Sequence, residues 1–352
     1  MLRFALALVS CISAVTALAS PLASPLTCYN DAGQAVDSWF MIKAPKGTDS
    51  LYYDATQQGF SVPKNNINST TGGALATTLQ QAWVNTTDYL MFNDQPAGST
   101  KSNSTVGHTK GVWMWSDTTA VVLQHSIPLF PLGPSKTPKY KGLGSNAYTY
   151  AQHLACFTFP LSELAALAAQ TPLTVPGLYD VRVSPNAPST IKALANGAFS
   201  KKPLCTQTAV QTSAQTAVTY FAKSTQWNNE LYANCVAPAL SASLAVESWI
   251  RGSATGPACG KAQQVLDVQA LAYPSINPFS ETNDHSKWAV SLNATSSWVC
   301  PADINRMRTQ FVRGGSAFCF QDPVLASALR KAITATNQCA RRGALRSALP
   351  YF

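Results

Sequence analysis

The sequence carries little charge. Only 12% of its 352 residues are charged, whereas soluble proteins usually carry about a quarter, and acidic residues number 16 against 25 lysines and arginines. No polar tract or proline-rich block accompanies this deficit, so disorder is not expected. Beyond the first residues no apolar run is long enough to cross a bilayer, which excludes a multi-span membrane protein. The net charge of +9 favours polyanions as partners: nucleic acid, anionic glycans or an anionic membrane.

Metal-binding patterns are also lacking. The sequence contains neither Cys-x-x-Cys nor His-Glu-x-x-His, so we expect no structural zinc site and no metal-dependent nuclease chemistry. Residues 1–19 place Arg3 before a short apolar run that ends in Ala17-Leu18-Ala19, which is typical of a secretory signal peptide cleaved after Ala19. Its removal leaves eight cysteines, and an even number in an exported chain predicts disulfides. Four N-glycosylation sequons are consistent with export through the secretory pathway: Asn68, Asn85, Asn103 and Asn293.

The apolar patterns predict a mixed α/β chain. Short runs rich in aromatic or β-branched residues predict buried strands over 39–43, 111–115, 120–123 and 155–159. Helical patterns cover 73–84, 161–170, 227–248 and 323–336. A Pro/Ser/Thr-rich stretch over 171–203 separates two halves that both contain strands and helices. We expect the tryptophans Trp113, Trp115, Trp227 and Trp288 mostly to pack in the core.

A weak internal repeat relates these halves. His108-Thr-Lys110 and His285-Ser-Lys287 each stand at the start of an expected strand. His125 follows His108 by 17 residues, and the polar cluster at Asp303 and Asn305 begins 18 residues after His285. A single His-x-Lys is typical of an exposed strand edge, but two copies among four histidines indicate chemistry. The fourth histidine, His153, has no counterpart and is expected to be structural.

The His-x-Lys spacing suits phosphate. Residues i and i+2 of a strand point to the same face, so each histidine would project beside its lysine. A lysine offers charge to the non-bridging oxygens, and an imidazole can attack phosphorus or donate a proton. Two such pairs related by a pseudo-dyad would supply one histidine for attack and one for the leaving group, without a metal.

The same motifs resemble the deoxyribonuclease II family of acid endonucleases. Gly107-His-Thr-Lys-Gly111, His125-Ser-Ile-Pro128 and Asp284-His-Ser-Lys-Trp288 carry this resemblance. Further matches run from about Cys28 to Cys339 and include Cys28-Tyr-Asn-Asp31, Asn93-Asp-Gln-Pro96, Phe221-Ala-Lys-Ser224, Asp303-Ile-Asn-Arg306 and Arg313-Gly-Gly315. Leu129 departs from the pattern, because many relatives carry a basic residue in this segment.

The resemblance implies a phospholipase D-like fold with two pseudo-symmetric α/β halves, about 28–170 and 204–339, around one active site. Residues 20–352 would form a single catalytic domain ending in a basic tail over 340–352. The implied activity is metal-independent cleavage of DNA, with no cofactor, leaving 3′-phosphate and 5′-hydroxyl ends. His108 and His285 would be catalytic, Lys110 and Lys287 would bind phosphate, and His125, Asp303 and Asn305 would support the site. It further implies lysosomal or secreted localisation and allows a homodimer.

The resemblance also implies three disulfides, Cys28–Cys156, Cys259–Cys339 and Cys300–Cys319. Cys205 and Cys235 then remain for a fourth. By analogy His108 would be the nucleophile and His285 the acid/base, although the internal symmetry leaves the reverse assignment open. Two titrating imidazoles predict an acidic optimum. We expect nearby lysines to oppose their protonation and Asp284 or Asp303 to favour it.

Two other functions fit the same residues. A phosphodiesterase of the same fold could act on RNA or on a phospholipid head group. A catalytically inactive secreted protein could keep only a basic cleft for nucleic acid, although such a binder would not need histidine at both positions.

Overall fold

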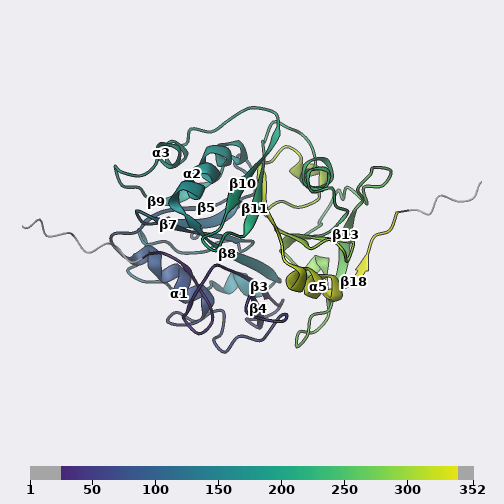
Figure 1. The fold of residues 1–352 in the computed structure, drawn as a ribbon, viewed down its shortest axis with the longest axis horizontal. Helices are drawn as coiled ribbons and strands as arrows, with labels where there is room; N and C mark the ends of the chain where they lie inside the picture. The colour runs from purple at the N-terminus through teal and green to yellow at the C-terminus, as the bar shows by residue number, and fades with distance from the viewer. Residues whose placement is uncertain (1–24, 340–352) are drawn as a thin grey trace, which may run out of the picture.

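A computed structural model describes residues 25–339. The expected signal peptide over 1–19 and the basic tail over 340–352 lie outside the described residues. Figure 1 shows two β-structures side by side, one formed by the first half of the chain and the other by the second half. The fold is therefore mixed α/β, as the sequence predicts. No helix within residues 25–339 has the length and apolar character needed to cross a membrane.

The first half builds a seven-stranded sheet in the order β4-β3-β8-β7-β6-β5-β9. Its four strands that the sequence predicts are present as β3, β6, β7 and β8. A two-stranded ribbon, β1-β2, precedes the sheet. The elements are β1 (Cys28–Tyr29), β2 (Ala35–Val36), β3 (Ser38–Lys43), β4 (Ser50–Asp54), α1 (Ala74–Gln80), β5 (Asp88–Asn93), β6 (Lys110–Trp115), β7 (Thr119–His125), β8 (Gln152–Pro160), α2 (Leu161–Gln170), β9 (Leu178–Arg182) and α3 (Ser189–Ala195).

The second half builds a nine-stranded sheet in the order β10-β11-β17-β16-β15-β12-β13-β14, with β18 paired to β13. Its elements are β10 (Cys205–Gln211), β11 (Ala217–Lys223), a π-helical turn (Tyr232–Val236), α4 (Ala237–Leu240), β12 (Leu244–Ser248), β13 (Val265–Leu271), β14 (Phe279–Ser280), β15 (Lys287–Ser291), β16 (Trp298–Pro301), β17 (Gly315–Gln321), α5 (Pro323–Ala332) and β18 (Ile333–Thr336).

The two sheets share a five-stranded core. The order β3-β8-β7-β6-β5 in the first half matches β11-β17-β16-β15-β12 in the second. Every neighbouring pair in both sets is antiparallel. The sets differ at one edge, because β9 joins β5 antiparallel whereas β13 joins β12 parallel. The repeated strand order places β6 and β15, which carry the two lysines, at equivalent positions.

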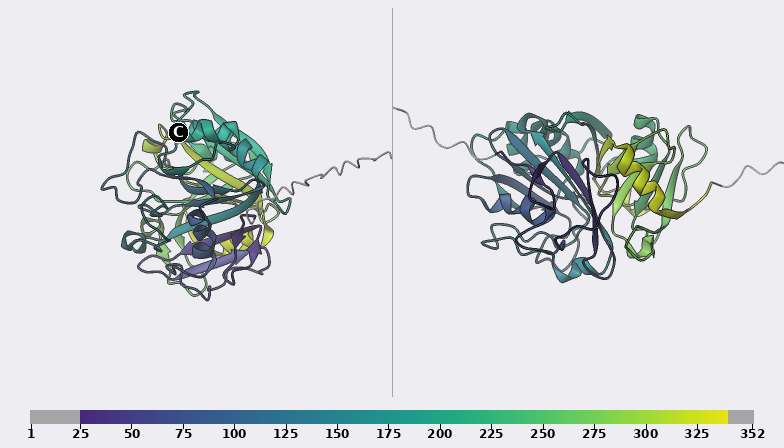
Figure 2. Two further views of the ribbon diagram at one scale, coloured as in Figure 1. Left: turned by 90° about the vertical axis from the view of Figure 1, so that its left-hand side faces the viewer. Right: turned by 60° about the horizontal axis from the view of Figure 1, so that its bottom comes forward.

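One hydrophobic cluster joins the halves. It combines residues of both sheets with residues of α2, α3 and α5, and Phe157 of β8 packs against Phe318 and Phe320 of β17. The Asp322 carboxylate caps α5 by accepting from the Leu325 N–H and also accepts from the Tyr53 hydroxyl of β4. In Figure 2 the yellow α5 lies beside the strands of both halves. The two halves are thus held as one packed unit.

Two of the helix predictions from the sequence are wrong in part. The segment over 227–248 contains only the short π-turn and α4, and then becomes strand β12. Ser241 ends α4 with a φ of 51°, and all five residues of β12 are buried between β13 and β15, so the strand shows no alternation of polar and apolar residues. The helix expected over 323–336 ends at Ala332, and the β-branched run that follows forms β18.

Three of the four tryptophans expected in the core are buried there, namely Trp113, Trp115 and Trp288, whereas Trp227 is half-buried.

The stretch over 171–203 that separates the two halves in the sequence is more than a linker. It contains β9, which pairs with β5, and the helix α3.

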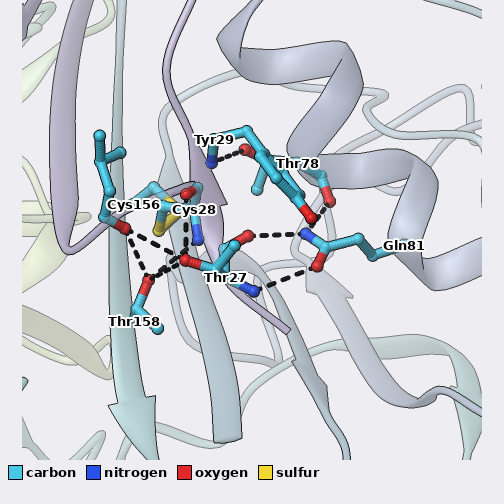
Figure 3. The surroundings of a disulfide bond; sticks show 8 residues. Thr27, Cys28, Tyr29, Thr78, Gln81, Cys156 and Thr158 are labelled. Carbon is cyan, nitrogen blue, oxygen red and sulfur yellow. Dashed lines mark hydrogen bonds between the residues drawn. A yellow bond between two sulfur atoms is a disulfide. The ribbon is translucent and has the colours of Figure 1, made fainter. Parts of the chain in front are cut away.

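Four disulfides tie these elements together, with the pairs that the sequence analysis expects: Cys28–Cys156, Cys205–Cys235, Cys259–Cys339 and Cys300–Cys319. The first joins β1 to β8 in the middle of the first sheet (Figure 3). Around it the Thr158 hydroxyl accepts from the Cys28 N–H at 2.9 Å, and the Gln81 side-chain amide bonds both main-chain groups of Thr27. The start of the described chain is therefore fixed by a covalent bond and by side-chain hydrogen bonds.

Candidate active site

The two His-x-Lys motifs meet at one cavity. Lys110 and Lys287 are the first residues of β6 and β15, and each histidine lies two residues before its strand. His108, Lys110, His285 and Lys287 line a cavity of about 210 Å³ together with Asn305. The structure therefore brings together five of the seven site residues predicted from the sequence, and they come from both halves of the chain.

Each histidine is held by the opposite half. The His108 N–H donates to the Gly314 carbonyl at 2.9 Å, just before β17. The His285 N–H donates to the Ala151 carbonyl, also at 2.9 Å, just before β8. Since β8 and β17 occupy equivalent positions in the two sheets, this exchange of hydrogen bonds is itself symmetric. The main chain at each histidine is therefore fixed by a contact between the halves.

Two glycines allow the close approach on the His108 side. A Cβ atom on Gly107 would lie 2.0 Å from the Thr174 carbonyl oxygen, and one on Gly314 would lie 2.1 Å from the same oxygen. The Gly107 N–H donates to the Val175 carbonyl at 2.7 Å. Three segments of main chain therefore cross here with no room for a side chain, which explains glycine at both positions.

His108 lies in a charged environment. Its Nε2 is 3.8 Å from Oδ2 of Asp94, a buried carboxylate at the end of β5. Lys110 and Arg313 also form ion pairs with Asp94, and the Arg313 Nη2 lies 3.0 Å from Oδ2. Although burial opposes ionisation, Lys110, His108 and Arg313 hold the pKa of Asp94 well below its ordinary value. Asp94 is therefore a fixed negative charge beside His108.

Burial and the charge of Lys110 lower the pKa of His108, and Asp94 opposes them. The expectation that Asp284 or Asp303 would play this part is wrong. The Asp303 carboxylate accepts from the Ser316 N–H and hydroxyl at 2.6 and 2.5 Å, and the Asp284 carboxylate accepts from the Ser286 N–H. Asp94 and Arg313 both lie in segments that resemble the family, Asn93-Asp-Gln-Pro96 and Arg313-Gly-Gly315, but no local pattern indicates their role beside His108.

His285 lies in an aromatic environment. Its ring stacks on Tyr150 with centroids 4.3 Å apart and an interplanar angle of 6°. Trp249 approaches it at 3.9 Å, tilted by 52°. The Arg251 guanidinium covers both aromatic rings, at 5.6 Å from that of Tyr150 and 5.1 Å from that of Trp249. None of these three neighbours was predicted from the sequence, because nothing in their local pattern marks them as site residues.

Cations surround this second histidine. Burial, followed by the charges of Lys287, Lys110 and Arg251, lowers the pKa of His285. Burial and the charge of Lys110 also lower the pKa of Lys287 to about 7. In the absence of an anion, His285 is therefore neutral near pH 7, and Lys287 gains its full charge only on acidification.

Two predicted site residues lie outside the cavity lining. His125 is buried at the end of β7, where its Nδ1 accepts from the Ile127 N–H and its ring packs edge-on to Phe130. Asp303 is also buried, and burial raises its pKa to about 7. His153 accepts the Lys287 N–H at Nδ1, which agrees with its expected structural role. These residues support the main chain around the cavity rather than face it.

The rim of the cavity holds two of the positions that the sequence singled out. Leu129 donates its N–H to the carbonyl of Gln95, a lining residue. Asn103, the third sequon, is exposed beside the lining residue Ser102, and its carbonyl accepts from Arg313 at 3.1 Å. A glycan on Asn103 would therefore start at the rim of the cavity.

The cavity presents more positive than negative charge. Lys110, Lys287, Arg251 and Arg313 line it, against the single carboxylate of Asp94. Within residues 25–339, no three His, Cys, Asp or Glu side chains form a group suited to a metal ion. The lining therefore offers cations, imidazoles and the side-chain amides of Gln95, Asn305 and Gln310, a set that suits a phosphate group.

Known proteins are similar to this chain over most of its length. The model of the family described as Deoxyribonuclease II matches residues 27–339. Deoxyribonuclease-2-alpha of Sus scrofa is 33% identical over 336 residues, covering 89% of this chain and 91% of the relative. Deoxyribonuclease-2 of Caenorhabditis elegans is 32% identical over 359 residues, covering 89% and 94%. Deoxyribonuclease-2-alpha of Rattus norvegicus is 31% identical over 340 residues, covering 90% and 95%. The chain belongs to the deoxyribonuclease II family.

Proposed function

We propose that the protein is an acid endodeoxyribonuclease that hydrolyses DNA to 3′-phosphate and 5′-hydroxyl products. The observation that carries this function is the meeting of two His-Lys pairs, one from each half, at a single cationic cavity. Membership of the deoxyribonuclease II family and relatives named deoxyribonuclease-2 support DNA as the substrate.

The chemistry uses the two imidazoles in sequence. One neutral histidine attacks the scissile phosphorus, and the other, protonated, donates its proton to the departing 5′ oxygen. A phosphohistidine linked to the 3′ nucleotide results. The second histidine then takes a proton from water, which attacks the phosphorus and releases the 3′-phosphate. Lys110, Lys287 and Asn305 bind the non-bridging oxygens and stabilise the charge that develops on them.

Acidic pH favours this scheme for two reasons. Both histidine pKa values are lowered, so the histidine that donates the proton is charged only when acid is added or when the phosphate of the substrate raises its pKa. Lys287, with a pKa of about 7, also becomes fully charged only below that value. Substrate binding and proton donation both therefore weaken as the pH rises.

Specificity for base sequence is low in this proposal. Lysine, arginine and main-chain contacts position the phosphodiester and do not read bases. We also propose that no metal or other cofactor is required, because the two imidazoles supply both the nucleophile and the proton. The four disulfides favour a lysosomal or secreted location.

The test is nicking of supercoiled plasmid in excess EDTA at about pH 5 and about pH 7.5. We expect faster nicking at the acidic pH, with products that accept a label at the 5′ end directly and at the 3′ end only after phosphatase treatment. His108→Ala and His285→Ala should each lower the rate by about 10²- to 10⁴-fold. Matched reactions on RNA and on a phospholipid test the alternative substrates, and cleavage only after metal is restored contradicts the mechanism.

A further inference from the structure

Equivalent positions around the two histidines hold different side chains. Lys110 pairs across the sheet with Asn93, and Lys287 pairs with Ser248. The next residues in the chain are Asp94 and Trp249, which contact His108 and His285 respectively. A carboxylate in one half therefore takes the place of an indole in the other.

The neighbours contributed by the opposite half differ in the same way. Ala151 and Gly314 accept the two histidine N–H groups, and the residues just before them are Tyr150 and Arg313. Tyr150 stacks on His285, whereas Arg313 pairs with the carboxylate beside His108. One histidine has two charged neighbours, and the other has two aromatic neighbours.

The charged neighbours of His108, Asp94 and Arg313, favour a histidine that gains and loses a proton. Burial and the charges of Lys110, Lys287 and Arg313 oppose protonation of His108, and the Asp94 carboxylate is the neighbour that stabilises its imidazolium form. Ion pairs with Lys110 and Arg313 keep that carboxylate ionised and in place. A general acid must be protonated when the leaving group departs, and a general base must accept the proton of the attacking water. His108 has the neighbour that both steps need.

The aromatic neighbours of His285, Tyr150 and Trp249, favour a histidine that stays neutral and fixed in orientation. Tyr150 and Trp249 cover the His285 ring, which restricts rotation of the imidazole. The charges that act most strongly on the pKa of His285 are those of cations, namely Lys287, Lys110, Arg251 and Lys43. Within residues 25–339, the histidine whose ring nitrogen lies within 4.0 Å of a carboxylate oxygen is His108, at 3.8 Å from Asp94, and not His285. A nucleophile must offer a free lone pair in a fixed direction, which is what this environment provides.

We propose that Tyr150 and Trp249 are positioning residues that hold His285 as the nucleophile, and that His108 with Asp94 carries the proton. This inference rests on the proposed function and reverses the assignment made by analogy from the sequence. In the first step His285 bonds to phosphorus, the bond to the 5′ oxygen breaks, and that oxygen takes the His108 proton. In the second step neutral His108 takes a proton from water, the water oxygen bonds to phosphorus, and His285 departs.

A substrate with a good leaving group separates the two roles. Thymidine 3′-(p-nitrophenyl phosphate) releases p-nitrophenolate, which departs without a proton. We expect His108→Ala to release about one equivalent per enzyme in a burst and then to stall, because nothing activates water for the second step. His285→Ala should give no burst. Mass spectrometry of peptides kept at alkaline pH should locate the thymidine 3′-phosphoryl group on His285. His108→Asn and His285→Asn, which preserve side-chain size, serve as second variants, with the melting temperature as a check of folding.

The outcomes are distinct. A burst from His285→Ala and none from His108→Ala overturns the assignment but leaves the proposed function intact. No burst from either variant, with a wild-type enzyme that cleaves DNA in EDTA, overturns both the assignment and the covalent intermediate. A wild-type enzyme that cleaves neither DNA nor the diester overturns the proposed function and the inference together.

The positioning role has its own test. Tyr150→Leu removes the stacked ring and should lower the burst rate of the His108→Ala enzyme by about 10- to 100-fold, with little change in the substrate concentration that gives half the maximal burst rate. Tyr150→Phe keeps the ring and should restore the rate. Tyr148→Leu is the matched control, since Tyr148 is a half-buried tyrosine that packs in a different cluster around α1. An equal loss in Tyr148→Leu, or no loss in Tyr150→Leu, overturns the positioning role.

Discussion

The two halves of the molecule use one backbone plan for two environments. Five strands have the same order and direction in each half, and each half gives a carbonyl to the histidine of the other. Yet Asp94 and Trp249, at equivalent positions, give one histidine a negative charge and the other an aromatic ring. The backbone thus fixes where the imidazoles meet, and a few side chains decide what each can do.

A third equivalent pair, Ser126 and Asp303, shows the same divergence, and only Ser126 lines the cavity. Ser126 follows β7 and accepts the His153 N–H at its hydroxyl. Asp303 follows β16 and accepts the Ser316 N–H at its carboxylate. Both bonds tie the end of one strand to the next strand, but only Asp303 brings a group whose pKa, raised by burial to about 7, can change charge near neutral pH.

The largest expected effect concerns the backbone that both environments share. Gly314→Ala would drive its Cβ to 2.1 Å from the Thr174 oxygen, whereas the equivalent Ala151 already carries a Cβ. We expect kcat to fall by about 10²-fold, because the carbonyl that holds His108 must move. Gly72→Ala is the control, since its Cβ would meet only a side-chain atom at 3.3 Å. Full activity in Gly314→Ala would show that the exchanged hydrogen bond does not set the position of His108.

Next in size is the removal of the charge that distinguishes His108. Asp94 raises the pKa of this histidine, so Asp94→Asn lowers that pKa further and decreases the protonated fraction at any given pH. We expect the optimum for DNA cleavage to move to lower pH and the rate at about pH 5 to fall roughly 10-fold. Asp49→Asn, at an exposed position, provides the control. A shift of the optimum to higher pH would contradict the proton-carrying role of His108.

Much of the fold was predictable from the sequence where a local pattern determines it. The strands over 39–43 and 111–115 and the helix over 161–170 are marked by composition and period, and the structure confirms them. The strand over 244–248 was not predictable, because a strand buried on both faces has the same apolar pattern as a buried helix. Only its pairing with β13 and β15 determines its structure.

The site residues also divide into those that a local sequence pattern predicts and those that it does not. The His-x-Lys motifs were predictable because the chemistry needs both residues within one short segment. Asp94, Tyr150 and Trp249 act through contacts between strands and between halves. Their roles depend on which residue lies opposite in the register, and a sequence without that register gives no sign of them.

A smaller effect is expected from Lys287, which links the two environments through its pKa of about 7. Above this pH the lysine loses its charge, and arginine would keep it. Lys287→Arg should therefore lower KM for DNA several-fold at about pH 8 and change it little at about pH 5. Lys101→Arg, on the exposed loop beside the cavity, is the control. An equal change at both pH values would mean that the titration of Lys287 does not govern binding.

The smallest effect tests whether the aromatic side also guides the DNA strand. Arg251 is exposed, lines the cavity and lies over the rings of Tyr150 and Trp249. If it contacts a phosphate, Arg251→Gln should reduce the dependence of log Kd on log salt by roughly one unit and weaken binding about 2- to 5-fold. Measuring this in the His285→Ala enzyme separates binding from cleavage. An unchanged salt slope would place the DNA backbone nearer Arg313, on the charged side of the cavity, so the two environments would differ in substrate contact as well as in proton chemistry.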